Sequence, residues 1–168
     1  MRYDELEAAI LELVIAAGED NLRAFGLDTV TRLTREDLLD TAVDDELTGD
    51  AWAALATARE TVRTADAAEL RALLVRIDEG VLADGDLDQG LLTAFTALEH
   101  WTTYLEENRR GEIYELAIRS IEEVDFQVSV DLDDVLATPE MTAEYARIER
   151  LLTAGRRPPS PEGMRRAR

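Results

Sequence analysis

The residues best suited to chemistry in this sequence are three aspartates at alternate positions, Asp84, Asp86 and Asp88. A calcium loop of the helix–loop–helix type begins in this way, but it also needs glycine at loop position six and glutamate at position twelve. The glycine is absent from position six, and position twelve is Phe95, so the coordination shell is incomplete. We therefore predict a turn between two helices, in which Gly85 ends one helix and Asp86 or Asp88 caps the next.

The single histidine, His100, is the natural candidate for proton transfer near neutral pH. Zinc and di-iron sites need further histidine or cysteine ligands, and the sequence contains no cysteine and no second histidine. A catalytic triad would have to bring Ser120, Ser129 or Ser160 to His100, and none of these serines lies in a glycine–serine–glycine turn. We interpret His100 as a structural residue and predict no catalytic residue, no metal site and no cofactor.

Carboxylates are the remaining reactive groups, because the chain has neither lysine nor a glycine-rich phosphate loop. They are densest late in the sequence, where Glu122 and Asp125 are three residues apart and share a helix face. We expect this region to form an acidic face that binds a partner, and its candidate residues are Glu122, Glu123, Asp125, Asp131, Asp133 and Asp134. A divalent-metal enzyme that uses the same carboxylates is the alternative.

The charge balance limits the class of partner. The chain has 37 acidic and 18 basic residues, all of the latter arginines, for a net charge of -19 and a pI near 4.3. Such a surface repels nucleic acid and anionic membranes, so we expect neither as a partner. Two interpretations remain, namely a generally solvated acidic surface, as in a salt-tolerant or high-GC organism, and a surface complementary to a basic protein.

The first residues of the chain predict a cytoplasmic protein. Their apolar residues are interrupted by Glu5, Glu7 and Glu12, so the pattern matches neither the apolar core of a signal peptide nor a membrane span. The absence of cysteine is compatible with a reducing compartment.

Apolar residues recur at intervals of three and four along nearly the whole chain, which predicts an all-α, up-and-down bundle. We expect about six to eight helices in one acidic domain, residues 1–154. Thr34 and Asp37 resemble a capping box for a helix over 35–47, and a cleaner start lies at Asp50. Ala56 and Leu92 belong to the apolar stripes that we expect to face inward. The expected helices cover about residues 6–17, 19–33, 35–47, 50–62, 70–77, 91–105, 113–128 and 139–152.

The composition changes at Gly155, after which the chain contains five arginines, three prolines and one glutamate. We predict that residues 155–168 form a basic, disordered tail. Such a tail serves as a spacer, touches the acidic domain, or weakly contacts an anionic partner.

The region from roughly Leu91 to Leu152 resembles a known group of bacterial proteins in its pattern of helices. This region reads as a helix rich in small apolar residues, a short polar turn, a helix carrying Val124 and Asp125, an acidic stretch, and a final amphipathic helix opened by Pro139. It resembles the YjaG-like family of uncharacterised bacterial proteins and similar all-helical immunity proteins encoded near polymorphic toxins. The resemblance implies a compact all-α domain without an established catalytic role, and it carries no site residues over.

These observations lead to one functional hypothesis and two alternatives. The hypothesis is a non-enzymatic, immunity-like binding domain whose carboxylates meet a basic protein around an apolar or aromatic patch. The alternatives are the divalent-metal enzyme and a homodimer in which an apolar patch pairs with itself. Convergence of carboxylates in a pocket favours the enzyme, and their spread over a convex face favours the binding domain.

Overall fold

The computed structural model describes residues 1–42, 44–82, 87–128 and 133–155, which form seven α-helices and one short 3₁₀ helix. The predicted all-α bundle is thereby confirmed. The elements are α1 (Tyr3–Ala16), α2 (Glu19–Leu33), η1 (Glu36–Leu39), α3 (Gly49–Thr61), α4 (Ala67–Glu79), α5 (Gln89–Glu107), α6 (Arg110–Val128) and α7 (Pro139–Thr153).

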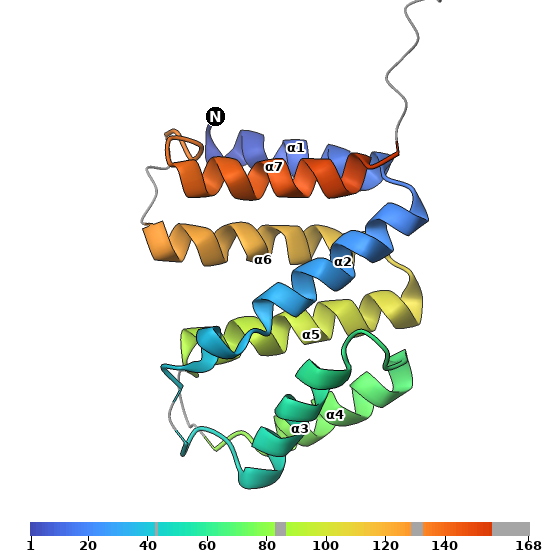
Figure 1. The fold of residues 1–168 in the computed structure, drawn as a ribbon, viewed down its shortest axis with the longest axis vertical. Coiled ribbons are helices and arrows are strands. Elements are labelled where there is room, and N and C mark those ends of the chain that lie inside the picture. The colour runs from blue at the N-terminus through green and yellow to red at the C-terminus, as the bar shows by residue number, and fades with distance from the viewer. Residues whose placement is uncertain (43, 83–86, 129–132, 156–168) are drawn as a thin grey trace, which may run out of the picture.

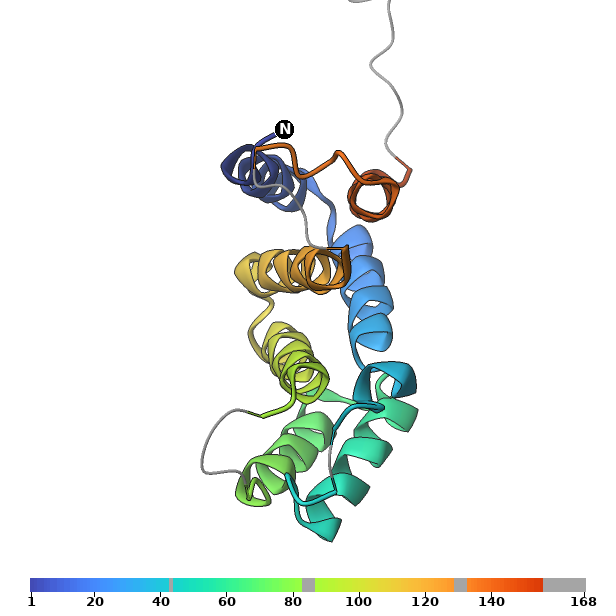
Figure 2. The same cartoon turned by 90° about the vertical axis from the view of Figure 1, so that its left-hand side faces the viewer.

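The helices are stacked along the long axis of the molecule (Figure 1). α1 and α7 form one end, α6 and then α5 follow, and α3 with α4 forms the other end, an order that Figure 2 shows from the side. α2 runs diagonally along this stack and contacts α5, α6 and α7. From α3 to α6, helices that follow one another in sequence also pack together, whereas α1 packs on α6 and α7, far along the chain.

One continuous core runs through the stack, because each long helix turns a stripe of apolar residues toward its neighbours. On α1 the stripe is Leu6, Ile10 and Val14, which are all buried as their spacing predicts. The large aromatic members of this core are Phe25 of α2 and Trp101 and Tyr104 of α5. No helix in the described ranges is both long and apolar enough to cross a membrane.

The helix over 35–47 was wrongly predicted. Only the four-residue helix η1 forms there, and none of its residues is buried. Thr34 does not open a helix, because its hydroxyl donates to the carbonyl of Val30 at 2.8 Å and it serves as the C-cap of α2. The next helix begins at Gly49, and its N-cap is Thr48 rather than Asp50.

The aspartate-rich turn is partly as predicted. Asp88 is the N-cap of α5, and its Oδ1 accepts hydrogen bonds from the amides of Gly90 and Leu91 at 3.0 and 3.3 Å. Asp84, Gly85 and Asp86 lie outside the described residues. The preceding helix nevertheless ends at Glu79 with Gly80 as its C-cap, so the expectation that Gly85 ends it is wrong.

Two residues of the predicted apolar stripes face outward. Ala56 is exposed, because α3 buries Ala54, Leu55 and Ala58 instead. Leu92 is also exposed, whereas the next residue, Thr93, is buried. The last described residue is Gly155, so the predicted tail lies almost entirely outside the described part of the chain.

Candidate acidic face

The predicted acidic set divides over different sides of the molecule. Glu122 and Asp125 lie on the side of α6 that faces the start of α1, since both carboxylates act electrostatically on Tyr3. Glu123 lies elsewhere, where its carboxylate accepts hydrogen bonds from Gln127 of α6 and Thr93 of α5 at 3.0 and 3.5 Å. Glu122, Glu123 and Asp125 therefore do not form one continuous face.

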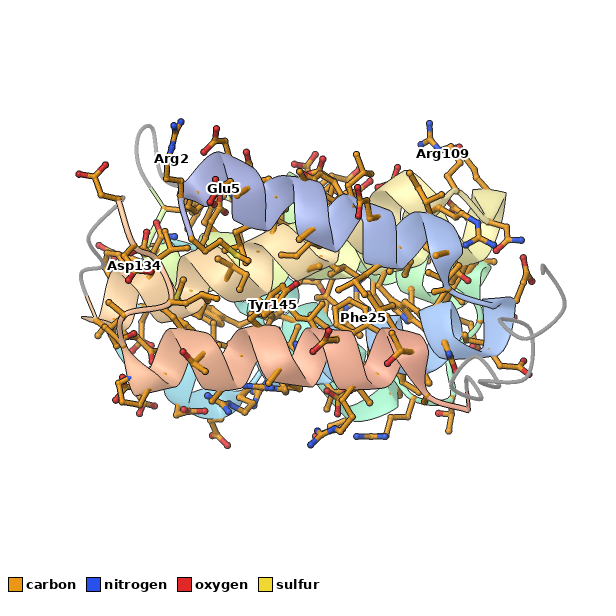
Figure 3. The ribbon with its side chains drawn as sticks, turned by 90° about the horizontal axis from the view of Figure 1, so that it is seen from above. Arg2, Glu5, Phe25, Arg109, Asp134 and Tyr145 are labelled. Atoms are coloured by element: carbon orange, nitrogen blue, oxygen red, sulfur yellow. The ribbon has the colours of Figure 1, made fainter. Side chains whose placement is uncertain are left out.

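The later members of the set belong to the segment before α7. Asp134 forms an ion pair with the amino group of Met1 at 3.0 Å, and the amide of Val135 donates to the carbonyl of Met1. Figure 3 shows Asp134 at the same end of the molecule as Arg2, with Arg109 at the opposite end. Asp133 is exposed nearby, and Asp131 lies outside the described residues.

A different acidic surface emerges where α1 packs against α6. Tyr3 and Glu7 lie one turn apart on α1, and Tyr114, Glu122 and Asp125 lie on α6. We call these five residues the α1/α6 face. All five side chains are half-buried, so each is partly covered by the protein and partly open to solvent.

Burial and nearby carboxylates raise the pKa values of the two tyrosines of the α1/α6 face. Burial, followed by the carboxylates of Glu122 and Glu7, raises the pKa of Tyr3 to about 12. Burial and the carboxylates of Glu7 and Glu115 likewise raise the pKa of Tyr114. Both phenols thus remain neutral hydrogen-bond donors in a strongly negative field.

One arginine lies on α6 between these groups. The Nη1 of Arg119 donates to Glu122 at 2.8 Å, so one guanidinium of α6 stands against the three carboxylates that define the face. Its Nε is buried and has no hydrogen-bond partner among the described residues. The α1/α6 face therefore keeps an excess of negative charge.

The arginines of the rest of the domain do not reduce this excess. Arg110 donates through Nη1 to the carbonyls of Val14 and Ala17, at 2.9 and 2.6 Å, and so caps the end of α1. Most others are held in ion pairs with carboxylates of their own chain, namely Arg2, Arg32, Arg35, Arg59, Arg71, Arg76, Arg109 and Arg147. In the described ranges, Glu7 and Glu115 form no ion pair.

The most enclosed charges lie elsewhere, between α2 and α7. Arg147 donates to Glu144 and Asp28 at 2.7 and 2.6 Å, and Arg32 contacts Glu144 at 3.1 Å. A small cavity of about 60 Å³ lies beside Arg32 and Glu144. Every one of these charges has a partner, so we assign the group to structure, where it joins α7 to α2. This buried group of charges could not be predicted from the sequence, because Glu144 and Arg147 have the three-residue spacing of an ordinary ion pair on a helix surface.

His100 takes part in a contact between two helices. Its Nδ1 lies 2.8 Å from Oε2 of Glu112, and Arg109 contacts the other oxygen of that carboxylate at 3.0 Å. This contact joins α5 to α6 near their connection. The hydroxyl of Ser120 donates to the carbonyl of Ala117 at 2.8 Å, and Ser129 and Ser160 lie outside the described residues.

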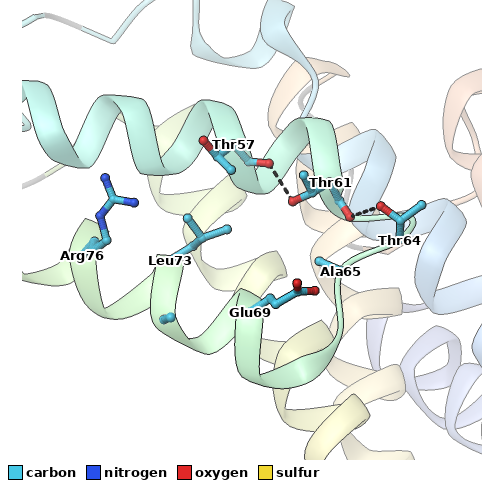
Figure 4. Close-up of a pocket in the computed structure, with 8 residues that line it drawn as sticks. Thr57, Thr61, Thr64, Ala65, Glu69, Leu73 and Arg76 are labelled. Carbon is cyan, nitrogen blue, oxygen red and sulfur yellow. Dashed lines mark hydrogen bonds between the residues drawn. The ribbon is translucent and has the colours of Figure 1, made fainter.

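A groove with a volume of about 400 Å³ lies between α3 and α4 (Figure 4). The hydroxyls of Thr57, Thr61 and Thr64 line it, but each donates to a backbone carbonyl of its own helix or turn. Arg76, at one end of the groove, is paired with Asp50 at 2.6 Å. The groove therefore contains no pairing of a nucleophile with a base.

Metal chemistry finds no support in the described part of the chain, where no three histidine or carboxylate side chains are grouped to hold an ion. The three carboxylates of the α1/α6 face, which come from two helices, are accordingly not grouped to hold an ion. No family model, curated protein or solved structure matches this chain, so the chemistry of the face itself has to indicate what binds there.

Proposed function

We propose that this chain is a non-enzymatic protein-binding domain that recognises a basic protein through the α1/α6 face. The observation that carries the proposal is the meeting of Tyr3 and Tyr114 with Glu7, Glu122 and Asp125 on one surface. A surface with tyrosine beside carboxylate suits arginine or lysine. The tyrosine ring packs against the aliphatic part and the charged group of such a side chain, and the carboxylate forms an ion pair with it.

An exposed aromatic residue extends this surface. Phe126 follows Glu122 by four residues on α6, and 69% of its surface is exposed. A large apolar side chain at the edge of a charged face supplies area that a partner buries, which slows dissociation. The carboxylates accelerate the encounter, and this contribution weakens as salt is added.

The resemblance to immunity proteins adds a biological setting to the proposal. An immunity-like domain acts by covering a partner's working surface, and a basic toxin domain has the charge that the α1/α6 face requires. We place this interaction in the cytoplasm, where a chain without cysteine loses nothing to a reducing environment.

The test is an affinity pull-down from the native lysate at low and moderate salt, with identification by mass spectrometry. The Glu7→Gln/Glu122→Gln variant removes two charges from the face. The matched control, Glu60→Gln/Glu79→Gln, removes two exposed charges from α3 and α4. We expect a basic protein to be retained by the wild type and the control at low salt and to be lost from the face variant.

Two outcomes contradict the proposal. Equal loss from both variants would mean that net charge, rather than this face, retains the partner. A saturable thermal shift with magnesium or calcium, in the absence of any partner, would support the divalent-metal alternative instead.

A further inference from the structure

The outward side of α1 carries apolar residues that the domain leaves uncovered. Ala8, Leu11 and Ile15 follow the three-and-four spacing of one helix face, opposite the buried Leu6 and Ile10. Leu11 is 43% exposed and Ile15 is 63% exposed. We call Ala8, Leu11 and Ile15 the α1 stripe. A surface helix with apolar residues on both sides indicates that something covers the outer one.

Carboxylates flank the α1 stripe on both edges. Glu7 lies along one edge, Glu5 and Glu12 lie along the other, and Glu19 follows just beyond the end of the helix. Neither Glu7 nor Glu12 forms an ion pair within the described ranges. A second copy of α1 is a poor occupant, because these edges would bring like charges together. The stripe instead suits a segment that combines positive charge with apolar contact area.

This chain contains such a segment, and it leaves the domain at the end of α7, near the connection from α1 to α2. The side-chain amide of Asn21 donates to the carbonyls of Leu152 and Ala154 at 3.1 and 2.9 Å, which holds the end of α7 against the start of α2. Figure 1 shows that this end of α7 adjoins the connection from α1 to α2. Gly155 then has a φ of 74°, a left-handed conformation that turns the chain.

The length and composition of the following residues fit the α1 stripe. Residues 156–168 span roughly 40 Å when extended at about 3.1 Å per residue, and the 14 residues of α1 span only about 21 Å. The segment carries five arginines, three prolines and one glutamate. Proline rings and arginine stems pack on apolar side chains, while guanidinium groups reach carboxylates at the edges.

We propose that the basic segment Arg156–Arg168 docks in cis on the α1 stripe of its own chain, with its arginines paired to the flanking glutamates. This inference does not rest on the proposed partner, because Leu11, Ile15 and the exit of the chain at Gly155 lie outside the α1/α6 face, which shares only Glu7 with the edge of the stripe. It assigns the segment a binding site rather than the role of a spacer.

A spin label near the end of the full-length chain tests the proposal. Because the sequence has no cysteine, Ala167→Cys provides a single attachment site for a nitroxide. At low salt we expect broadening of the amide signals of α1 from Ala8 to Ala16, with the amides of α3 unaffected at the other end of the molecule. Broadening that is absent from α1, or equal on α1 and α3, would overturn the proposal.

Two variants and one mixing experiment complete the test. Leu11→Ser/Ile15→Ser should reduce the broadening on α1 at least twofold, whereas the control Val75→Ser alters an equally exposed apolar residue on α4 and should leave it unchanged. A mixture of isotope-labelled protein without nitroxide and nitroxide-bearing protein without isotope reports contacts between molecules. Strong broadening in that mixture would overturn docking in cis, because it would show that the segment of one molecule binds a second molecule.

Discussion

The guanidinium of Arg147 lies over the ring of Phe25, with its Cζ atom 5.3 Å from the ring centroid. Phe25 is fully buried on α2, so the positively charged guanidinium of α7 lies against a ring of the core. The nitrogen atoms of the same group donate to Asp28, Thr29 and Glu144. The arginine is thus held by the ring on one side and by oxygen atoms around its edge.

Replacing this arginine should be costly. Arg147→Met leaves Glu144, only 4% exposed, without its closest cation, and breaking a buried pair in this way costs about 3–5 kcal/mol of unfolding free energy. Urea denaturation measures the loss. Arg150→Met, an exposed position on the same helix, is the control and should change stability by about 0.5 kcal/mol or less.

The double variant Glu144→Met/Arg147→Met separates charge from packing. It removes both buried charges and should regain much of the stability lost in Arg147→Met, because apolar side chains of similar volume replace buried ion pairs at little cost. If Arg147→Met were as stable as Arg150→Met, the buried network would not hold α7 to α2.

Gly26 should not tolerate a methyl group. A Cβ atom there would lie 2.5 Å from Cζ3 of Trp101 and 2.8 Å from Cδ1 of Ile113, both in the core. We expect Gly26→Ala to lose about 1–3 kcal/mol through overpacking. The matched change Gly111→Ala, where a Cβ meets no atom within 4 Å, should leave stability unchanged or gain up to about 1 kcal/mol. Equal thermal midpoints for the two variants would contradict this packing.

The protein should lose stability in alkali through Tyr3. Its pKa rises from an ordinary value of 10.0 to about 12, so the folded state favours the protonated phenol. The associated stability is complete below pH 10 and disappears as the pH approaches 12. Circular dichroism against pH should therefore show alkaline unfolding, and Tyr3→Phe should move the transition to higher pH. Tyrosinate absorbance in urea, where the phenol ionises near its ordinary pKa, is the control.

Calcium should not stabilise the aspartate-rich turn. Oδ1 of Asp88 accepts the amides of Gly90 and Leu91, and Oδ2 accepts the hydroxyl of Thr41 at 2.8 Å. With one oxygen capping α5 and the other bound by Thr41, we expect millimolar calcium to leave the thermal midpoint unchanged. Asp88→Ala should lower stability by about 1 kcal/mol through loss of the cap, in calcium and in chelator alike. A midpoint that rises with calcium only in the wild type would reveal a site.

Gly90 illustrates what the sequence alone does not reveal. In the sequence it appears one place too late for a calcium loop. In the structure a Cβ at Gly90 would collide with the carbonyl oxygen of Leu38, because η1 packs directly against the start of α5. The glycine is explained by a contact between segments about fifty residues apart, which periodicity does not report.

The helices themselves were largely predictable. Apolar residues such as Leu6, Ile10 and Val14 recur with the helical period of 3.6 residues, and these same three residues are the buried ones in α1. The prediction failed at 35–47, where local capping signals were present but η1 buries no residue that would stabilise a longer helix.

The acidic site was predicted only in part. Density of carboxylates along the chain identified Glu122 and Asp125, but it also included Glu123, which points toward α5. Tyr3 and Glu7 were missed, because they reach the site from the other end of the sequence through the packing of α1 on α6. No local pattern reports that contact.

The packing of α1 also has a consequence for synthesis on the ribosome. Its partners α6 and α7 end at Val128 and Thr153, and Arg110 supplies its cap, so α1 emerges long before any of them exists. At about 5–20 residues per second, the interval is on the order of ten seconds. During that time the nascent helix has apolar residues on both sides and no neighbour, which makes it the natural segment for a chaperone to hold.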